Sequence, residues 1–176
     1  MSAPSLGLPR RRLLWAGSGL LLAAAWPPRA HAHAAAEIEI ALSGTANGSE
    51  VWFRPRGLLV QPGQAVHWVN RDQGNVHTAT AYHPDNGKPL RIPQGARSWN
   101  SDYLMPGQSF VTVFEVPGVY DYFCLPHEHA GMVARIVVSR ADPAVRPYAD
   151  TDARLPPAAL ANLVDVAAIL KGPPID

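Results

Sequence analysis

The chain has almost no cysteine: Cys124 is the single thiol among 176 residues. An intramolecular disulfide is therefore excluded. In an oxidising compartment, a lone thiol is open to oxidation or to intermolecular pairing unless it is buried or bound to a metal. The residues around Cys124 therefore decide what this thiol does.

Charged residues are also scarce, at 16% of the chain. The formal net charge is +1, but four arginines precede Glu37, the first acidic residue. The remainder has eleven basic and fourteen acidic residues, a balance of −3. This mildly acidic body has no basic patch of the kind that nucleic-acid binding requires, so nucleic acid is excluded as a partner.

The N-terminal apolar stretch is shorter than a typical membrane-spanning helix. It runs for 14 residues from Leu13 to Trp26, whereas about 20 are needed. Arginines 10–12 precede it and AHAHA follows, which offers small-residue cleavage sites. We interpret 1–34 as a cleaved signal peptide, and the paired arginines resemble the twin-arginine type. An ordinary secretory signal or an uncleaved anchor are the alternatives. The signal predicts a periplasmic or otherwise exported protein without stable membrane insertion after cleavage.

Prolines and glycines, eighteen and fourteen in number, separate short apolar runs and favour an all-β protein. No βαβ rhythm is present, so the pattern predicts an antiparallel Greek-key β-sandwich or barrel of seven or eight strands. The region 83–106 is predicted to be mainly loop. The strand-length segments are 37–43, 51–53, 57–60, 65–70, 76–82, 109–116, 118–124 and 132–139.

The chain divides into one domain and two flanking segments. The domain body spans 35–140, and 141–176 holds a Pro-rich linker followed by a short helix. The pattern of 157–172 predicts an amphipathic helix that ends at a glycine and two prolines. We expect this helix to pack on the sandwich or on a partner.

The chemistry lies in YFCLPHEHAGM, where Cys124, His127 and Met132 form a C-x2-H-x4-M pattern between two predicted strands. His77 lies 47 residues before Cys124, where sandwich packing can bring it beside this loop. Thiolate and thioether are soft donors and imidazole is borderline, so the set favours copper that cycles between Cu(I) and Cu(II). Two histidines, a cysteine and a weak axial methionine form a type 1, or blue, copper site.

Other readings of these residues stay open. His129 competes with His127, and it would be the fourth ligand of a zinc site. Met132 could instead be a core methionine that opens a strand, and Met105 is a weaker axial candidate. The remaining four histidines are assigned to the signal, to a strand or to a turn: His31, His33, His67 and His83.

Three segments resemble the plastocyanin, pseudoazurin and halocyanin-like branch of the cupredoxins: WVNRDQGNVHT, DYFCLPHEHAGMVARIVV and PLRIPQGARSWNSDYLMPGQSFVTVF. The resemblance covers most of 37–139 and implies a Greek-key sandwich with one type 1 copper that shuttles single electrons between larger redox proteins. It implies ring-nitrogen ligation by His77 and His127, thiolate ligation by Cys124 and axial ligation by Met132. The C-terminal helix is not part of the usual pattern.

Two expectations concern the surroundings of the thiolate. The backbone N–H of Thr78 should donate to Cys124, whereas Pro126 has no N–H to offer. In the strand before Cys124, Tyr120 and Tyr122 should flank an outward Asp121.

These features favour a monomeric electron carrier over an enzyme. Its donor and acceptor would be redox proteins, such as a cytochrome or an oxidase or reductase. A copper oxidase or nitrite reductase needs further copper centres, for which the chain has no spare histidine clusters. A copper store or chaperone would need more than three methionines. A purely structural sandwich would require four matching ligands to coincide by chance.

Overall fold

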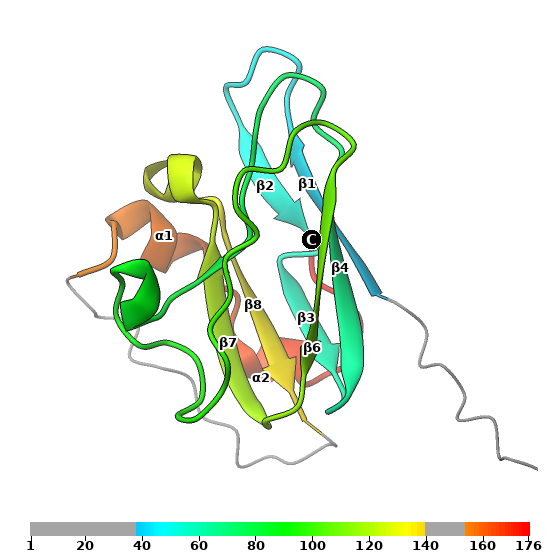
Figure 1. The fold of residues 1–176 in the computed structure, drawn as a ribbon, viewed down its shortest axis with the longest axis vertical. Helices are drawn as coiled ribbons and strands as arrows, with labels where there is room; N and C mark the ends of the chain where they lie inside the picture. The colour runs from blue at the N-terminus through cyan, green and yellow to red at the C-terminus, as the bar shows by residue number, and fades with distance from the viewer. Residues whose placement is uncertain (1–37, 140–153) are drawn as a thin grey trace, which may run out of the picture. The chain divides into compact units, whose positions relative to one another are not determined.

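A computed structural model describes residues 38–139 and 154–176, which form two packed β-sheets and a short helical C-terminal segment (Figure 1). The all-β sandwich is confirmed, with eight strands. Their bounds are β1 (Ile38–Gly44), β2 (Val51–Arg54), β3 (Gly57–Val60), β4 (Gln64–Asn70), β5 (Thr80–Ala81), β6 (Ser109–Phe114), β7 (Gly118–Phe123) and β8 (Val133–Val138). The signal peptide predicted over 1–34 and the linker residues 141–153 lie outside the described residues.

One sheet has the strand order β2-β1-β4-β6 and the other β3-β8-β7-β5. The β1–β4 and β3–β8 pairs are parallel and the other pairs are antiparallel, so both sheets are mixed, not purely antiparallel as expected. Alternation along β4 buries Val66 and Trp68 and leaves His67, between them, half-buried. Trp68 lies at the centre of the core, with its ring centroid 5.6 Å from that of Tyr122.

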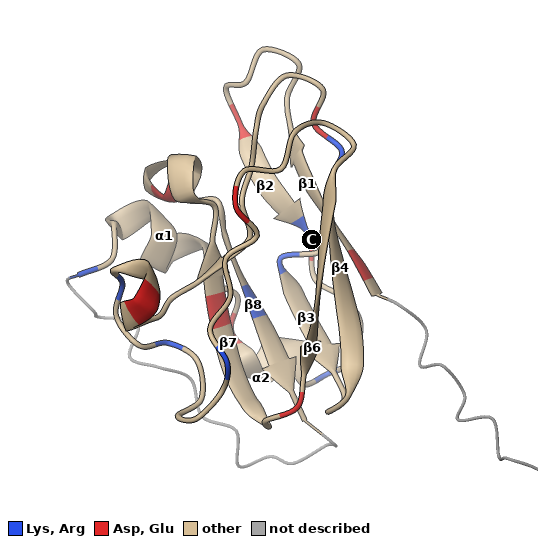
Figure 2. Cartoon of the chain, viewed as in Figure 1, with Lys and Arg blue, Asp and Glu red and all other residues tan. Residues whose placement is uncertain are grey.

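Strand β7 is buried on both faces, which the sequence did not predict. Tyr120 and Tyr122 belong to the core between the sheets. The expectation that Asp121 points outward into solvent is wrong, since its side chain is fully buried. It lies between Arg91 and Arg135, and Figure 2 shows this acidic segment of β7 beside the basic segment of β8.

The C-terminal segment covers the outer face of the second sheet. Packing on the sandwich was one of the two expected positions of this segment, and the other was packing on a partner. Leu155 and Ala159 form a buried cluster with Phe123 of β7. Val166 and Ile169 form another with strand residues of the same sheet. None of the described helices is long and apolar enough to cross a membrane.

The helix expected over 157–172 is present as two shorter ones, α1 (Pro157–Asn162) and α2 (Val166–Ile169). Asp165 restarts the helix as an N-cap, because its Oδ1 accepts a hydrogen bond from the N–H of Ala168 at 3.0 Å. The interruption leaves the carbonyl of Val164 to accept from Nη1 of Arg135 at 2.7 Å. The break therefore fits the segment to the sheet beneath it.

The β-prone run at 76–82 forms a strand only at β5. The loop that follows contains the 3-10 helix η1 (Pro84–Asn86). His77 precedes β5 and is held by an isolated bridge to Leu104. This bridge fixes His77 at the end of the sandwich where β7 leads into the 3-10 helix η2 (Leu125–Ala130).

Candidate metal centre

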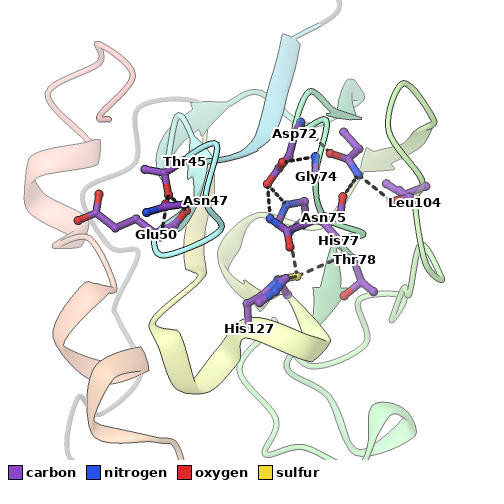
Figure 3. A network of polar contacts seen from close by, with 12 residues as sticks. Thr45, Asn47, Glu50, Asp72, Gly74, Asn75, His77, Thr78, Leu104 and His127 are labelled. Carbon is purple, nitrogen blue, oxygen red and sulfur yellow. Dashed lines mark hydrogen bonds and ion pairs between the residues drawn. The ribbon is translucent and has the colours of Figure 1, made fainter.

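Three of the four predicted ligands come together at one end of the sandwich (Figure 3). The thiol sulfur of Cys124 lies 3.6 Å from Nδ1 of His77 and 3.4 Å from Nδ1 of His127. All three ligand atoms lie within 4.8 Å of one another. Both imidazoles thus present the same nitrogen to the sulfur.

Two backbone hydrogen bonds between His77 and Leu104 hold His77 in position. The N–H of His77 donates to the carbonyl of Leu104 at 3.2 Å, and the N–H of Leu104 donates to the carbonyl of His77 at 2.8 Å. Nδ2 of Asn70, at the end of β4, donates to the carbonyls of Leu104 and Asn75. One buried amide therefore joins the strand to the two loops that hold His77.

Cys124 and His127 are positioned by η2. Cys124 stands at the N-terminal end of this helix, and the N–H of His127 donates to the carbonyl of Cys124 at 3.0 Å. The N–H of Thr78 donates to the sulfur at 3.3 Å, which confirms the predicted contact. The hydroxyl of Thr78 accepts from the N–H of Leu125 at 2.8 Å, so the segment after His77 also holds the loop.

The other candidates differ in their surroundings. Met132 is 1% exposed and belongs to the same core cluster as Cys124, and its N–H donates to the carbonyl of His127 at 3.1 Å. Its role as axial ligand stays a prediction. His129 is exposed and is not one of the three clustered side chains, and Met105 is 52% exposed.

Burial sets the protonation of the site. Desolvation raises the pKa of Cys124 to about 11, and hydrogen bonds from Thr78 and His127 only partly offset it. Desolvation, together with the nearby His77, lowers the pKa of His127. The metal-free site is therefore a thiol beside a neutral imidazole at pH 7, and metal binding must displace the thiol proton.

A buried carboxylate that sequence reasoning missed lies behind His77. Oδ2 of Asp72 is 3.0 Å from Nε2 of His77 (Figure 3). Burial acts to raise the pKa of Asp72, but hydrogen bonds from Asn75, Gly74 and His77 outweigh it and lower the pKa to about 2. The available signal was an acidic residue five positions before the histidine, in a turn that follows a strand.

The ligand loop is also supported from outside. Glu128, between the two loop histidines, is buried and ion-paired with Lys88. Helix α1 packs against η2, which Figure 1 shows side by side. Gly131 makes this contact possible, because a Cβ there would lie 2.3 Å from Nδ2 of Asn162 and 3.1 Å from the carbonyl of Ala158.

Replacing Gly131 by alanine is expected to destabilise the protein by more than backbone strain alone. Its φ of 82° favours glycine, and a side chain in that region costs about 1–2 kcal/mol. Displacement of Asn162 adds to this cost. Gly95→Ala is the matched control, since its φ is 81° and no atom lies within 4 Å of the added Cβ. Urea unfolding of both variants measures the difference, and equal losses would exclude a tight α1 contact.

The donor set at this site fits copper. One thiolate and two imidazole nitrogens suit a metal that alternates between a soft and a harder oxidation state. Within the described part of the chain, His77, Cys124 and His127 are the group of three side chains that lie close enough together to bind one metal ion. Met132 belongs to the same buried core cluster as Cys124, and a thioether ligand from it stays a prediction.

Comparison with known proteins agrees with the donor set. The family profile described as copper binding proteins, plastocyanin/azurin family, matches residues 39–139. Plastocyanin of Scenedesmus fuscus is 34% identical over 97 residues, which cover 53% of this chain and 92% of that protein. Chloroplastic plastocyanin of Tetradesmus obliquus is 33% identical over 94 residues, 53% of this chain, and the chain spans only 62% of its length.

The fold agrees as well. The crystal structure of native pseudoazurin from Hyphomicrobium denitrificans matches with a TM-score of 0.53 at 18% identity, over 77% of this chain and 97% of that one. This match concerns the fold alone. The family match and the plastocyanin relatives carry the assignment further: the chain belongs to the copper-binding plastocyanin/azurin family, and copper is its cofactor.

Proposed function

We propose that the mature chain is an exported, monomeric carrier of single electrons, with His77, Cys124, His127 and Met132 as the ligands of one type 1 copper. The observation that carries the proposal is the close approach of one thiol sulfur and two imidazole Nδ1 atoms in a family of copper proteins. Copper would supply the one-electron chemistry, by alternating between Cu(II) and Cu(I).

The residues around the site serve the carrier role by holding the ligands still. His77 is fixed by its bridge to Leu104, and Cys124 by the strand that precedes it. Ligands that hold their positions in both oxidation states keep the reorganisation accompanying electron transfer small. A buried and hydrogen-bonded thiol therefore favours fast transfer over chemistry on a bound substrate.

His127 is the proposed exit for the electron, since it is the more exposed of the two histidines. Leu125 beside it is 47% exposed. The carboxylate of η2, that of Glu128, is buried. An exposed leucine beside His127 and a buried carboxylate in the same loop suit brief docking of a redox protein such as a cytochrome, an oxidase or a reductase.

An enzymatic role receives less support. Copper oxidases and nitrite reductases need a further metal centre, whereas the described residues bring together one group of three potential ligands. We therefore propose a carrier between a donor and an acceptor, not an enzyme.

The proposed export to the periplasm rests on the N-terminal sequence, with its arginine cluster and short apolar stretch.

The visible spectrum of the Cu(II)-loaded mature protein tests the proposal. A strong band near about 600 nm is expected from thiolate-to-copper charge transfer, and a mild reductant should bleach it reversibly. Cys124→Ser should abolish the band, because an alcohol cannot replace the thiolate.

The two loop histidines give matched variants. His127→Ala should lose or strongly alter the band, whereas His129→Ala should keep it, because His129 is exposed and lies outside the cluster. A folded protein that binds one equivalent of Cu(II) without this band would contradict the electron-carrier proposal. Loss of the band in His129→Ala alone would reassign the ligand.

A further inference from the structure

The imidazole of His77 has two occupied sides. Nδ1 faces the sulfur of Cys124 at 3.6 Å, and Nε2 faces Oδ2 of Asp72 at 3.0 Å. The side chain of His77 is 0% exposed and that of Asp72 is 4% exposed. A carboxylate oxygen at this distance accepts a hydrogen bond from Nε2–H, so the neutral ring presents the lone pair of Nδ1 to the metal site.

We propose that Asp72 is a positioning residue of the copper centre, which fixes the tautomer of His77 and lowers the reduction potential by favouring the oxidised state. The inference rests on the proposed function, because it assumes that His77 is a ligand. It adds a fifth side chain that makes no contact with the metal and acts through the imidazole.

The carboxylate is held in place by its own contacts. Oδ1 of Asp72 accepts from the N–H of Gly74 at 2.8 Å, and Oδ2 also accepts from Nδ2 of Asn75 at 3.0 Å. The N–H of Asp72 donates to Oδ1 of Asn70 at 2.9 Å. These contacts orient the carboxylate toward His77 before any metal binds.

The neighbouring strand leaves room for this arrangement. A Cβ at Gly44, at the end of β1, would lie 2.3 Å from Oδ2 of Asp72. Any other residue at position 44 would displace the oxygen that contacts His77. Gly44 therefore leaves the space that the contact between Asp72 and His77 needs.

The carboxylate of Asp72 faces the ring of His77. In the described structure its Oδ2 lies 3.0 Å from Nε2, a hydrogen bond to the neutral ring. The adjacent arginine, Arg71, forms a bidentate pair with Glu39 instead, with Nη2 2.8 Å from Oε2. The carboxylate charge therefore remains available to interact with a cation bound on the other side of the ring.

Two effects favour Cu(II) over Cu(I). An imidazole that donates its second N–H to a carboxylate is a more basic ligand than one that donates to a neutral acceptor. In addition, Coulomb attraction scales with the charge of the ion, so a buried carboxylate stabilises a divalent ion more than a monovalent one. Both effects lower the reduction potential.

A purely structural role makes a different prediction. The contacts to Gly74 and Asn75 would stabilise the turn at 72–75 whether or not the site held a metal. Loss of such a role would lower the free energy of unfolding and weaken both oxidation states equally. The reduction potential separates the two roles, because it reports only the difference between Cu(II) and Cu(I) binding.

The test is Asp72→Asn in the full mature chain, which keeps the shape of the side chain and removes its charge. We expect the affinity for Cu(II) to fall about 10–100-fold, as for other partners of metal-bound histidines. The affinity for Cu(I) should fall less. At a fixed potential the ratio of oxidised to reduced protein should then fall about tenfold, which corresponds to a potential about 59 mV more positive.

Two variants serve as controls. Glu39→Gln removes a carboxylate that is paired with Arg71 at the surface, and it should leave the ratio within about twofold of wild type. Asn75→Ala removes one hydrogen bond to Asp72 but keeps the charge, so it should shift the ratio less than Asp72→Asn does. A ratio in Asp72→Asn within twofold of wild type, or equal losses of Cu(I) and Cu(II) affinity, would overturn the proposal.

A second measurement does not depend on the folding of a variant. In the Cu(I) form of the wild-type protein, nitrogen NMR should show that Nε2 of His77 carries a proton and Nδ1 does not. Deprotonated Nε2 would overturn the role of Asp72.

The outcomes also separate the two proposals. A wild-type protein without the charge-transfer band contradicts the carrier function. A blue wild type whose Asp72→Asn variant has an unchanged reduction potential contradicts only this inference.

Discussion

Removal of residues 154–176 is expected to abolish the stable folded state. Leu155, Val166 and Ile169 are almost completely buried against the second sheet. Complete burial of such side chains contributes about 1.5–3 kcal/mol each, so the three together contribute roughly 5–9 kcal/mol. The total stability of a domain is only about 5–15 kcal/mol. Urea unfolding of the truncated chain, followed by far-UV circular dichroism, measures the loss.

A point variant gives a graded version of the same test. Ile169→Ala is expected to cost about 2–5 kcal/mol, because it leaves a cavity against the sheet. Lys171→Ala, at an exposed position two residues later, should stay within about 0.5 kcal/mol of wild type. A truncated chain with the urea midpoint of the full chain would show that the segment is a dispensable tail.

The second large effect is expected at Asp121. Its carboxylate accepts from Nε of Arg91 at 2.9 Å, and from Nε and Nη2 of Arg135 at 2.6 and 3.0 Å. Asp121→Asn leaves two buried guanidinium groups without the charge between them, and breaking a buried pair in this way costs about 3–5 kcal/mol.

Asp85→Asn is the matched control for Asp121→Asn, because Asp85 is an exposed carboxylate in the loop of the same domain. Its effect should remain within about 0.5 kcal/mol. Thermal and urea unfolding of both variants give the comparison. A loss below about 1 kcal/mol in Asp121→Asn would mean that solvent or other partners satisfy the two arginines once the carboxylate is gone.

The sequence predicted what depends on local pattern. Alternation and turn residues were enough for most strands, and the spacing of Cys124, His127 and Met132 was enough to point to a copper site. The contact between Thr78 and Cys124 also followed, because a residue next to one ligand must lie close to another. The strands and the loop ligands depend on residues close together along the chain, whereas the Thr78 contact follows from the prediction that His77 reaches the same site.

What the sequence did not predict depends on distant segments. Asp121 was expected to face solvent because β7 alternates, but its outer face is covered by residues more than 30 positions later. The helix over 157–172 was predicted as one piece because apolar periodicity does not reveal that Asp165 caps the start of a second helix. Asp72 was passed over because nothing in a single acidic residue shows that Gly44, on another strand, leaves room for it.

The burial of Cys124 also bears on the lifetime of the chain before it acquires its metal. Thiol oxidation and thiol–disulfide exchange require both a thiolate and access to it. Cys124 offers little of either, since its side chain is fully buried and its pKa is raised to about 11. In the folded protein without copper, the thiol of Cys124 therefore reacts slowly with oxidants and with disulfides. Burial thus protects the ligand thiol from oxidation and from mixed disulfides until copper binds.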